Sequence, residues 1–246
     1  MAYELRIWAK PIPSESYVIG GDPAEGLDHG DDSVLEVLAG STGEQVAELQ
    51  GKVDPFTFGE LASMLGTYYN DALVGIENNK DGGANRVLHE IGYRNIYFEQ
   101  KDMGEPYDKH TIKLGINTNI RNRHRLISQA RRWMEDRSAI PVSKHLVAQF
   151  EIFVLRSTKF EAIPGGHDDL VMAWVIAIEM LRVHLMMSDA KNTDLKPLWN
   201  GKEVEDTLGD EFDTEPINLI DKHVEQARKK ELDQRPDYST TVEAMV

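Results

Sequence analysis

Two adjacent carboxylates, Asp168 and Asp169, directly precede a strongly apolar segment. Residues 170–178 are all apolar, so they predict a buried helix that begins at the two acids. Acidic residues at a helix start are common caps, because the positive end of the helix dipole favours negative charge. A buried helix can also hold such acids in place as metal ligands. The sequence at this pair leaves both interpretations open.

Two further acids each follow an apolar segment that predicts a buried strand. Asp22 follows residues 16–21, and Glu77 follows residues 72–76. Taken singly, Asp22 before a proline is a common turn start, and Glu77 is equally typical of a solvated loop. Together with the acidic pair they add a second and third segment that could supply carboxylates to one site.

Such a carboxylate cluster suits hard divalent cations. The chain has no cysteine and 8 histidines, a donor set that favours Mg²⁺ or Mn²⁺ over zinc. Two such ions about 3.5–4 Å apart activate a water and stabilise the leaving oxygen in phosphodiester hydrolysis. We therefore expect Asp22, Glu77, Asp169 and Asp168 to be the catalytic metal ligands, with Asp22 shared by both ions.

Three neighbouring residues carry alternatives. Asp31 and Asp32 would add an outer ligand or orient a water, or they belong to a solvated loop. His167, next to the acidic pair, is compatible with a metal ligand, a proton shuttle or a turn histidine that hydrogen-bonds to the backbone. These alternatives stay open at the level of sequence.

An arginine-rich segment, residues 119–137, predicts a helix with one buried side. Arg121, Arg125 and Arg132 fall near one face of it, opposite an apolar side that includes Trp133. The arginines fit either a solvated face with ion pairs or phosphate contacts beside the metal site. Phosphate contacts of this kind would be independent of base sequence and sensitive to salt.

Charge and composition limit the function classes. The formal net charge of −15 argues against a general nucleic-acid coat, yet residues 101–160 carry 12 Lys/Arg against 6 Asp/Glu. Residues 188–246 are acidic, with 15 acids against 8 bases. The absence of cysteine excludes disulfides, thiolate zinc sites and cysteine nucleophiles. We expect neither a signal peptide nor a membrane span, which fits a cytosolic setting.

The predicted elements indicate an α/β fold with a mixed sheet of about five strands or more, flanked by helices. Their order is typical of the ribonuclease H architecture, in which acids from the first and fourth strands meet one from a late helix. Predicted strands cover residues 16–21, 33–39, 44–50, 72–76, 95–98 and 159–163, and predicted helices cover 55–70, 81–91, 119–137, a segment from Ser143 to Phe153, and 169–187.

Four short motifs, in order, resemble the C-terminal nuclease domain of the large terminase subunit of tailed bacteriophages. The likeness covers roughly residues 16–187, and it is specific because the motifs occur together in one order and spacing. The motifs are Gly20-Gly21-Asp22-Pro23-Ala24-Glu25-Gly26 with Asp31-Asp32-Ser33, then Val74-Gly75-Ile76-Glu77-Asn78-Asn79, then Leu114-Gly115-Ile116-Asn117-Thr118-Asn119, and finally Phe160-Glu161-Ala162 with Gly165-Gly166-His167-Asp168-Asp169-Leu170-Val171-Met172-Ala173.

The resemblance implies a ribonuclease H-like, metal-dependent endonuclease that cuts concatemeric viral DNA during packaging. It places the metal-binding acids on Asp22, Glu77 and the pair Asp168 and Asp169, with Asp169 as the direct ligand and Asp168 beside it. It also implies double-stranded DNA, the portal and the small terminase subunit as partners, in the host cytoplasm at the procapsid. The isolated domain is expected to be monomeric and to have no membrane partner.

One departure from the large terminases affects how the chain is divided. The sequence lacks the Gly-x-x-x-x-Gly-Lys-[Ser/Thr] phosphate loop of an ATPase motor, and the first acidic motif is already reached at residue 22. We therefore expect the nuclease half alone, either as a fragment or as a separate product. Residues 1–187 would form the nuclease domain and residues 188–246 an acidic linker and tail, in which 217–232 are compatible with a terminal helix.

Two other readings stay open. A Holliday-junction resolvase or a ribonuclease H-type nuclease would use the same architecture and metal chemistry. A non-catalytic acidic scaffold would keep the fold, and its acids would not converge.

Overall fold

A computed structural model of the chain describes residues 2–78, 82–100, 112–156 and 159–192. Its centre is a five-stranded mixed sheet with the strand order β1-β4-β3-β2-β5. Strands β1 to β4 pair with antiparallel neighbours, whereas β5 runs parallel to β2. The predicted α/β class and mixed sheet are thus confirmed. The strands are β1 (Ala2–Ile7), β2 (Tyr17–Asp22), β3 (Ser33–Ala39), β4 (Gln45–Lys52) and β5 (Leu73–Ile76).

The edge strand β1 is one that the sequence analysis missed. Its apolar residues Tyr3, Leu5 and Ile7 alternate and pack against one core, while Glu4 and Arg6 point to the other face. Residues 95–98 were predicted as the strand that follows β5 in the sequence. In the structure they join the five-stranded sheet only by an isolated bridge between Ile96 and Val74. The segment continues into β6 (Phe98–Gln100), which pairs with β7 (Ile112–Leu114) in a separate two-stranded sheet.

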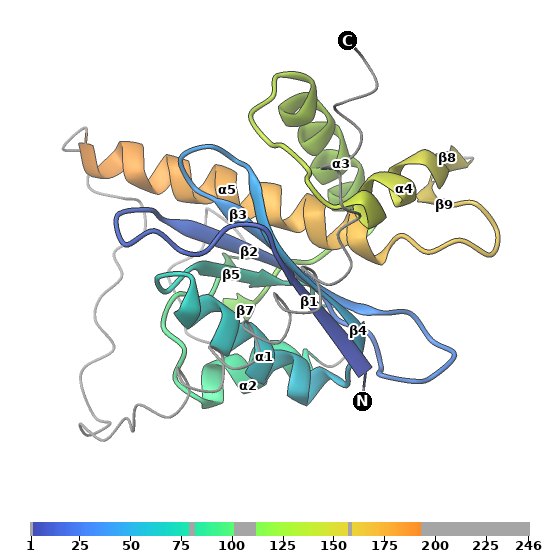
Figure 1. The fold of residues 1–246 in the computed structure, drawn as a ribbon, viewed down its shortest axis with the longest axis horizontal. Helices are drawn as coiled ribbons and strands as arrows, with labels where there is room; N and C mark the ends of the chain where they lie inside the picture. The colour runs from blue at the N-terminus through green and yellow to red at the C-terminus, as the bar shows by residue number, and fades with distance from the viewer. Residues whose placement is uncertain (1, 79–81, 101–111, 157–158, 193–246) are drawn as a thin grey trace, which may run out of the picture.

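Helices cover both faces of the sheet (Figure 1). On one face lie α1 (Pro55–Tyr68) and α2 (Gly83–Glu90), and on the other lies α5 (Asp169–Asn192). Beyond α5 are α3 (Ile120–Glu135) and α4 (Lys144–Ile152), followed by a hairpin of β8 (Phe153–Arg156) and β9 (Lys159–Ala162). Three of these helices have a capped N-terminus: the side chains of Asp54, Asn119 and Ser143 each accept a backbone N–H of the helix that follows.

Two of the element boundaries that differ from the sequence prediction are the ends of α4 and α5. Phe153, predicted at the end of a helix, is instead the first residue of β8, and it packs against Phe160 of β9 with ring centroids 6.1 Å apart. The long apolar helix passes the predicted end at residue 187 and continues to Asn192. The division of the chain at 187/188 stays a prediction, and the helix proposed over 217–232 lies outside the described residues.

Helix α5 crosses β2 at very close range, with its chain direction opposite to that of the strand. At one end, Ser16 Oγ lies 2.9 Å from His184 Nε2. At the middle, Gly20 lies directly under the backbone of Ala173 and Ala177, because a Cβ on Gly20 would sit 2.1 Å from the Ala177 nitrogen. The N-terminus of α5, Asp169, therefore comes to the end of β2 that carries Asp22.

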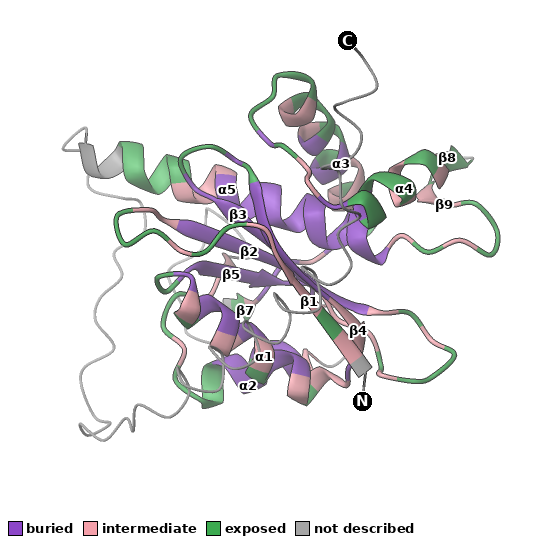
Figure 2. Cartoon of the chain, in the orientation of Figure 1, coloured by how far each residue is buried: buried purple, intermediate pink, exposed green. Residues whose placement is uncertain are grey.

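The apolar residues of α5 pack in the core of the protein. By length and composition alone, Asp169–Asp189 would be able to cross a membrane, yet 67% of its most apolar window is buried in the fold. Figure 2 shows the buried part of the helix over the sheet and the exposed part at its C-terminal end. Trp174, Ile176 and Ala177 are fully buried there, so core packing explains why this segment lacks polar residues.

Glu179 is a buried acid in the middle of this apolar helix. Its carboxylate accepts hydrogen bonds from Arg125 of α3 (3.1 Å), Gln129 of α3 (2.8 Å) and Arg182 (2.9 Å). Burial alone would raise the pKa of Glu179, but Arg182 and Arg125 together hold it below its usual value. This ion-pair group joins α3 to α5, and Arg125 takes part in it although its side chain is 48% exposed.

The glycine contact gives a first testable prediction. Gly20→Ala should destabilise the fold by about 3 kcal/mol, because a methyl group at this position has to push the α5 backbone away from β2. Gly30→Ala is the control, since its Cβ would lie 3.4 Å from the nearest atom and needs no displacement. Chemical denaturation of both variants measures the difference. Equal stability of Gly20→Ala and the parent would contradict the close packing.

Candidate active site

Two acids emerge side by side from neighbouring parallel strands. The last paired residues of β2 and β5 are Gly21 and Ile76, and the Glu77 N–H donates to the Gly21 carbonyl at 2.8 Å. Asp22 and Glu77 therefore lie next to each other at the carboxyl ends of the two parallel strands. Their carboxyl groups are close enough to hydrogen-bond to each other. The sequence expectation that these two acids are neighbours agrees with this geometry.

The acidic pair at the start of α5 reaches the same place. Asp169 is the first residue of the helix and is 6% exposed, and Glu77 is 7% exposed. Both Asp169 and Asp168 lie near enough to Asp22 to raise its pKa by repulsion. Four acids from β2, from the end of β5 and from the start of α5 therefore converge, as the sequence analysis expected of Asp22, Glu77, Asp168 and Asp169.

Burial and mutual repulsion make this cluster electrostatically unfavourable. The pKa of Asp22 is raised well above its usual value, first by burial and then by Glu77, Asp169 and Asp168. Burial also raises the pKa of Asp169 to about 6, although the Asp32 N–H partly offsets this effect. The neighbouring side chains that raise the pKa of Asp22 most are themselves acids.

Asp168 differs from its neighbour because it has a cationic partner. Its carboxylate forms an ion pair with the Arg123 guanidinium of α3. Arg123 is itself held by a hydrogen bond from Nε to the Phe160 carbonyl (3.0 Å), and its guanidinium carbon lies 6.0 Å from the Phe153 ring centre. The sequence placed Arg123 in a basic segment and gave no signal that it would pair with this acid.

The loop between β2 and β3 closes the site from another side. Asp32 donates its N–H to Asp169 Oδ2 at 2.9 Å, while its own carboxylate binds Lys52 (2.6 Å) and Gln50 (2.9 Å) of β4. The side chain of Asp32 is thus engaged by β4, which disfavours the role of a metal ligand. Neither Lys52 nor Gln50 was singled out in the sequence, because nothing in an ordinary strand end marks such a contact.

Asp31 and His167 lie at the mouth of the cluster. His167 Nδ1 is 3.4 Å from Asp31 Oδ1 and 3.9 Å from Asp169 Oδ2. The potential ligand atoms of Asp31, His167 and Asp169 all lie within 4.8 Å of one another. Asp31 and His167 are exposed, whereas Asp169 is buried. This arrangement keeps open the outer-ligand interpretation of Asp31 and the ligand or shuttle interpretation of His167.

A third motif supports the strand end that carries Glu77. Ile116 bridges to Glu77, and the Asn78 N–H donates to the Ile116 carbonyl at 2.7 Å. Gly115 has a φ of +78° and lies against the Ile76 carbonyl, where a Cβ would come within 2.3 Å. A glycine is needed here both for the left-handed backbone and for the close approach. The Leu114-Gly115-Ile116 segment thus fixes the position of Glu77.

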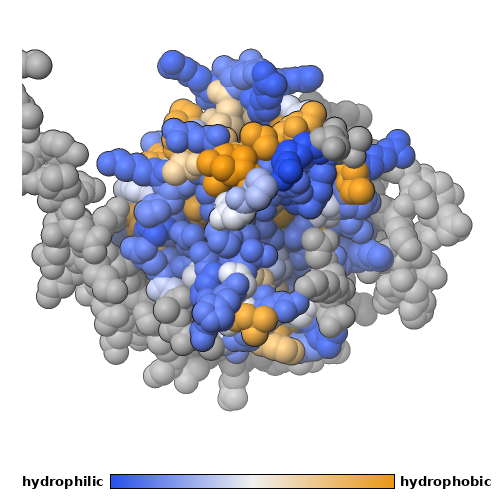
Figure 3. All heavy atoms as spheres, turned by 90° about the vertical axis from the view of Figure 1, so that its right-hand side faces the viewer, coloured by the Kyte–Doolittle hydropathy of each residue, from blue (hydrophilic) through white to orange (hydrophobic). Residues whose placement is uncertain are grey.

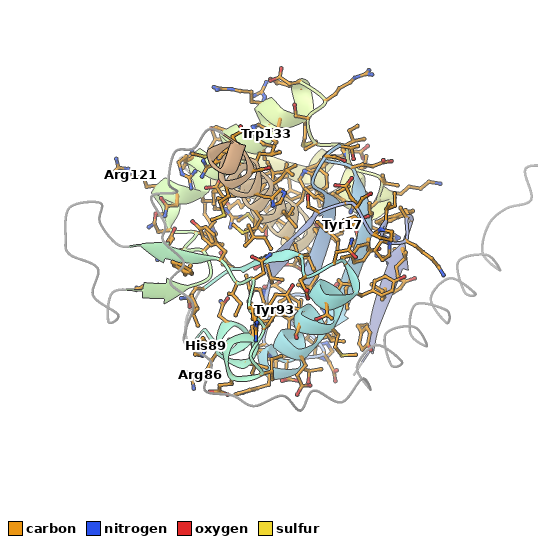
Figure 4. The ribbon with its side chains drawn as sticks, turned by 90° about the vertical axis from the view of Figure 1, so that its left-hand side faces the viewer. Tyr17, Arg86, His89, Tyr93, Arg121 and Trp133 are labelled. Carbon is orange, nitrogen blue, oxygen red and sulfur yellow. The ribbon has the colours of Figure 1, made fainter. Side chains whose placement is uncertain are left out.

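The predicted arginine face is only partly available to a ligand. Arg121 and Arg132 are exposed, and Figure 4 shows Arg121 pointing away from the body of the protein. Trp133, labelled in the same view, packs against the core shared by α3 and α5. Arg125 is also exposed, but its Nη1 binds Glu179 at 3.1 Å, so it has an ion-pair role as well.

The end of the molecule that carries the site is mainly polar. Figure 3 views the protein from the right-hand side of Figure 1, where the loops after β2 and before α5 project. Hydrophilic residues cover the middle of this face, and apolar residues gather in its upper part, at the height of α4 and the β8–β9 hairpin in Figure 1. Val147 of α4, Leu155 of β8 and Ile163, which follows β9, are exposed apolar residues.

Comparison with solved structures finds the same architecture in phage nucleases. The large terminase nuclease of thermophilic phage G20c matches with a TM-score of 0.55 and 21% identity, over 71% of this chain and 87% of that chain. The fold is that of the large terminase nucleases. The magnesium-bound G20c nuclease matches with a TM-score of 0.56 and 20% identity, over 71% and 86% of the two chains. The nuclease domain of Thermus phage P74-26 gives 0.50 and 21%, over 70% and 83%.

The resemblance to large terminase nucleases noted in the sequence is thereby confirmed as a likeness of fold. The G20c nuclease is also known with cobalt and with zinc bound, and these structures match with TM-scores of 0.53 and 0.51. No family model and no curated protein sequence matches the chain.

The different environments of the two adjacent acids predict opposite effects on stability in metal-free protein. Because the pKa of Asp169 is raised in the folded state, its charge costs stability as the pH rises through about 6. Asp169→Asn should therefore stabilise the protein by up to about 2 kcal/mol at pH 8 and have little effect at pH 4. Asp168→Asn should destabilise it by about 1 kcal/mol at pH 8, because the ion pair with Arg123 is lost.

Urea denaturation in the presence of a chelator, at pH 4 and pH 8, measures both effects. The two variants serve as each other's control, since they remove the same charge from adjacent positions. A loss of stability in Asp169→Asn at pH 8 would contradict the repulsion inferred for the cluster.

Proposed function

We propose that this protein is a Mg²⁺- or Mn²⁺-dependent DNA endonuclease whose metal ligands are Asp22, Glu77 and Asp169. The observation that carries the proposal is the convergence of the buried Glu77 and Asp169 with the half-buried Asp22, with acids as the neighbours that raise the pKa of Asp22. A fold keeps such a costly arrangement when a bound cation offsets the repulsion. Carboxylate oxygens are the donors that Mg²⁺ and Mn²⁺ prefer.

The four acids have different roles in this proposal. Asp22 lies between Glu77 on the neighbouring strand and Asp169 on α5, so it is the ligand best placed to be shared by two ions. Asp169 accepts the Asp32 N–H on Oδ2, which leaves its other oxygen for a cation. Asp168 stays paired with Arg123 and supports the site as the neighbour of the direct ligand. Two bound ions would supply an activated water and stabilisation of the leaving oxygen in phosphodiester hydrolysis.

DNA is the substrate that the surface around the cluster supports. The exposed Arg121 and Arg132 on α3 can contact backbone phosphates, and α3 is joined to the site through the Arg123–Asp168 ion pair. Contacts of this type read no base sequence, so cleavage is proposed to have little sequence preference and strong salt dependence. The acidic net charge of the chain does not oppose this, because bound divalent ions reverse the local field at the site.

The likeness to large terminase nucleases supports a role in viral genome packaging. In this proposal the protein cuts concatemeric viral DNA in the bacterial cytoplasm, at the procapsid, with the portal and the small terminase subunit as partners. Residues 1–187 would carry the nuclease, which is monomeric as an isolated domain, and 188–246 would form an acidic tail. ATP hydrolysis is not assigned to this chain, since its sequence contains no phosphate-loop motif.

The proposal predicts that Asp22→Asn abolishes DNA cleavage while the protein remains folded. The neutral amide removes the shared ligand and also part of the repulsion, so metal-free stability should not fall. Asp71→Asn is the matched control, because Asp71 precedes β5 and lies at the opposite end of that strand from Glu77. Plasmid cleavage in millimolar Mn²⁺ is the measurement. Full cleavage by Asp22→Asn would refute the assignment of the site.

Two further measurements decide between this function and its alternatives. Linear duplex DNA, four-way junctions and RNA–DNA hybrids are digested side by side, and preferential cutting of junctions or hybrids would favour a resolvase or a ribonuclease H. Thermal unfolding with and without Mn²⁺ tests the non-catalytic scaffold. A cation that binds only the folded state raises the melting temperature. An unchanged melting temperature in Mn²⁺ would favour the scaffold.

A further inference from the structure

Lys52 holds the loop between β2 and β3 at two points beside the acidic cluster. Lys52 is the last residue of β4, and its Nζ lies 2.6 Å from Asp32 Oδ1 and donates to the Gly30 carbonyl at 2.7 Å. Two residues earlier on the same strand, Gln50 donates from Nε2 to Asp32 Oδ2 at 2.9 Å. Both oxygens of the Asp32 carboxylate are thus bound by side chains of one strand.

The backbone of the same residue contacts the cluster. The Asp32 N–H donates to Asp169 Oδ2 at 2.9 Å, so any movement of Asp32 is transmitted to the Asp169 carboxylate. The register of β3 and β4 places Asp32 near Gln50 and Lys52, because Val34 pairs with Gln50 and Ser33 pairs with Gly51. The side chains of Lys52 and Asp32 are 29% and 24% exposed, which limits the competition of water for their ion pair.

The positive charge of Lys52 does not by itself favour a cation-binding site beside it. A cation near a cluster that binds cations weakens that binding through simple Coulomb repulsion. An ammonium that nevertheless sits beside the loop must contribute something that outweighs this effect. The contacts above show what it contributes, which is a fixed position for the Asp32 backbone N–H that Asp169 accepts.

We infer that Lys52 and Gln50 are positioning residues that act through Asp32 to hold the Asp169 carboxylate in the orientation that binds a divalent metal. The inference rests on the proposed function, and it extends the site to a strand that contributes no metal ligand. Hydrogen-bonding partners behind a metal ligand typically change metal affinity by about 10–100-fold when they are removed.

Mn²⁺ binding to the full chain, measured by isothermal titration calorimetry, tests the inference without recourse to cleavage. Lys52→Met removes the ammonium and keeps most of the stem, and its dissociation constant for Mn²⁺ should rise about tenfold. If Lys52 acted through its charge alone, the same variant would bind Mn²⁺ more tightly. Tighter or unchanged binding would therefore overturn the inference, and Lys52→Arg should restore most of the affinity.

Gln50→Leu gives a second test that leaves the net charge unchanged. It should also weaken Mn²⁺ binding, because Asp32 loses one of its two anchors, and unchanged affinity would count against the inference. This variant carries the test if Lys52→Met does not fold, which thermal unfolding in chelator shows. Lys10→Met is the control for charge, since Lys10 is exposed and follows β1 at the opposite end of β4 from Lys52, and its affinity should not fall. Absence of Mn²⁺ binding by the parent protein would instead refute the proposed function.

Discussion

The contact of the α5 backbone with Gly20 of β2 sets the position of everything at the site. A helix normally lies at side-chain distance from a sheet, but here the missing Cβ of Gly20 lets Ala173 and Ala177 approach the strand itself. Gly75 on β5 leaves room of a different kind, because the side chain of Met180 occupies the space that a Cβ would need. Because α5 runs opposite to β2, this contact brings the first residue of the helix to the last residue of the strand. The meeting of Asp169 with Asp22 follows from helix packing as much as from the acids.

The sequence predicted the central elements because their signals are local. The turn chemistry around 40–43, the Asp54-Pro55 start of α1 and the apolar run before Glu77 each identify an element without knowledge of the rest. The edge strand β1 also has a local signal, the alternation of Tyr3, Leu5 and Ile7 with Glu4 and Arg6, but the strand is only six residues long and its pairing with β4 is not visible in the sequence. Likewise, 95–98 has strand composition, yet only its bridge at Ile96 reaches the sheet, and the following residues pair with β7 instead.

In the candidate site, too, some residues were predicted from the sequence and others were not. The acids themselves were found in the sequence, since each stands at the boundary of an apolar segment. Their partners were not: the pairing of Arg123 with Asp168, and the hold of Lys52 on Asp32, join residues that are 45 and 20 positions apart in the chain (168 − 123 and 52 − 32). Such contacts depend on register and side-chain direction, which composition does not encode. For the same reason the sequence could not show that Arg125, among the exposed arginines of α3, pairs with Glu179.

A second pair of buried acids on the same face of the sheet shows what this fold does with acidic side chains that serve structure. Glu36 of β3 pairs with Gly20 of β2, and Glu48 of β4 pairs with Glu36 on its other side. Burial and Glu48 raise the pKa of Glu36, which favours its protonated form, while Arg6 of β1 forms an ion pair with Glu48 and Gln45 donates to Glu36. The protein thus supplies a cation and an amide of its own to this pair.

Around Asp22 it supplies further acids instead. The Arg123 guanidinium is directed to Asp168 and the Lys52 ammonium to Asp32, at the border of the cluster rather than at its centre. Two acidic groups therefore share one buried surface, and at the carboxyl ends of β2 and β5 the neighbours with the largest effect on the pKa of Asp22 are acids. That difference, more than the number of acids, supports the proposed placement of the cations.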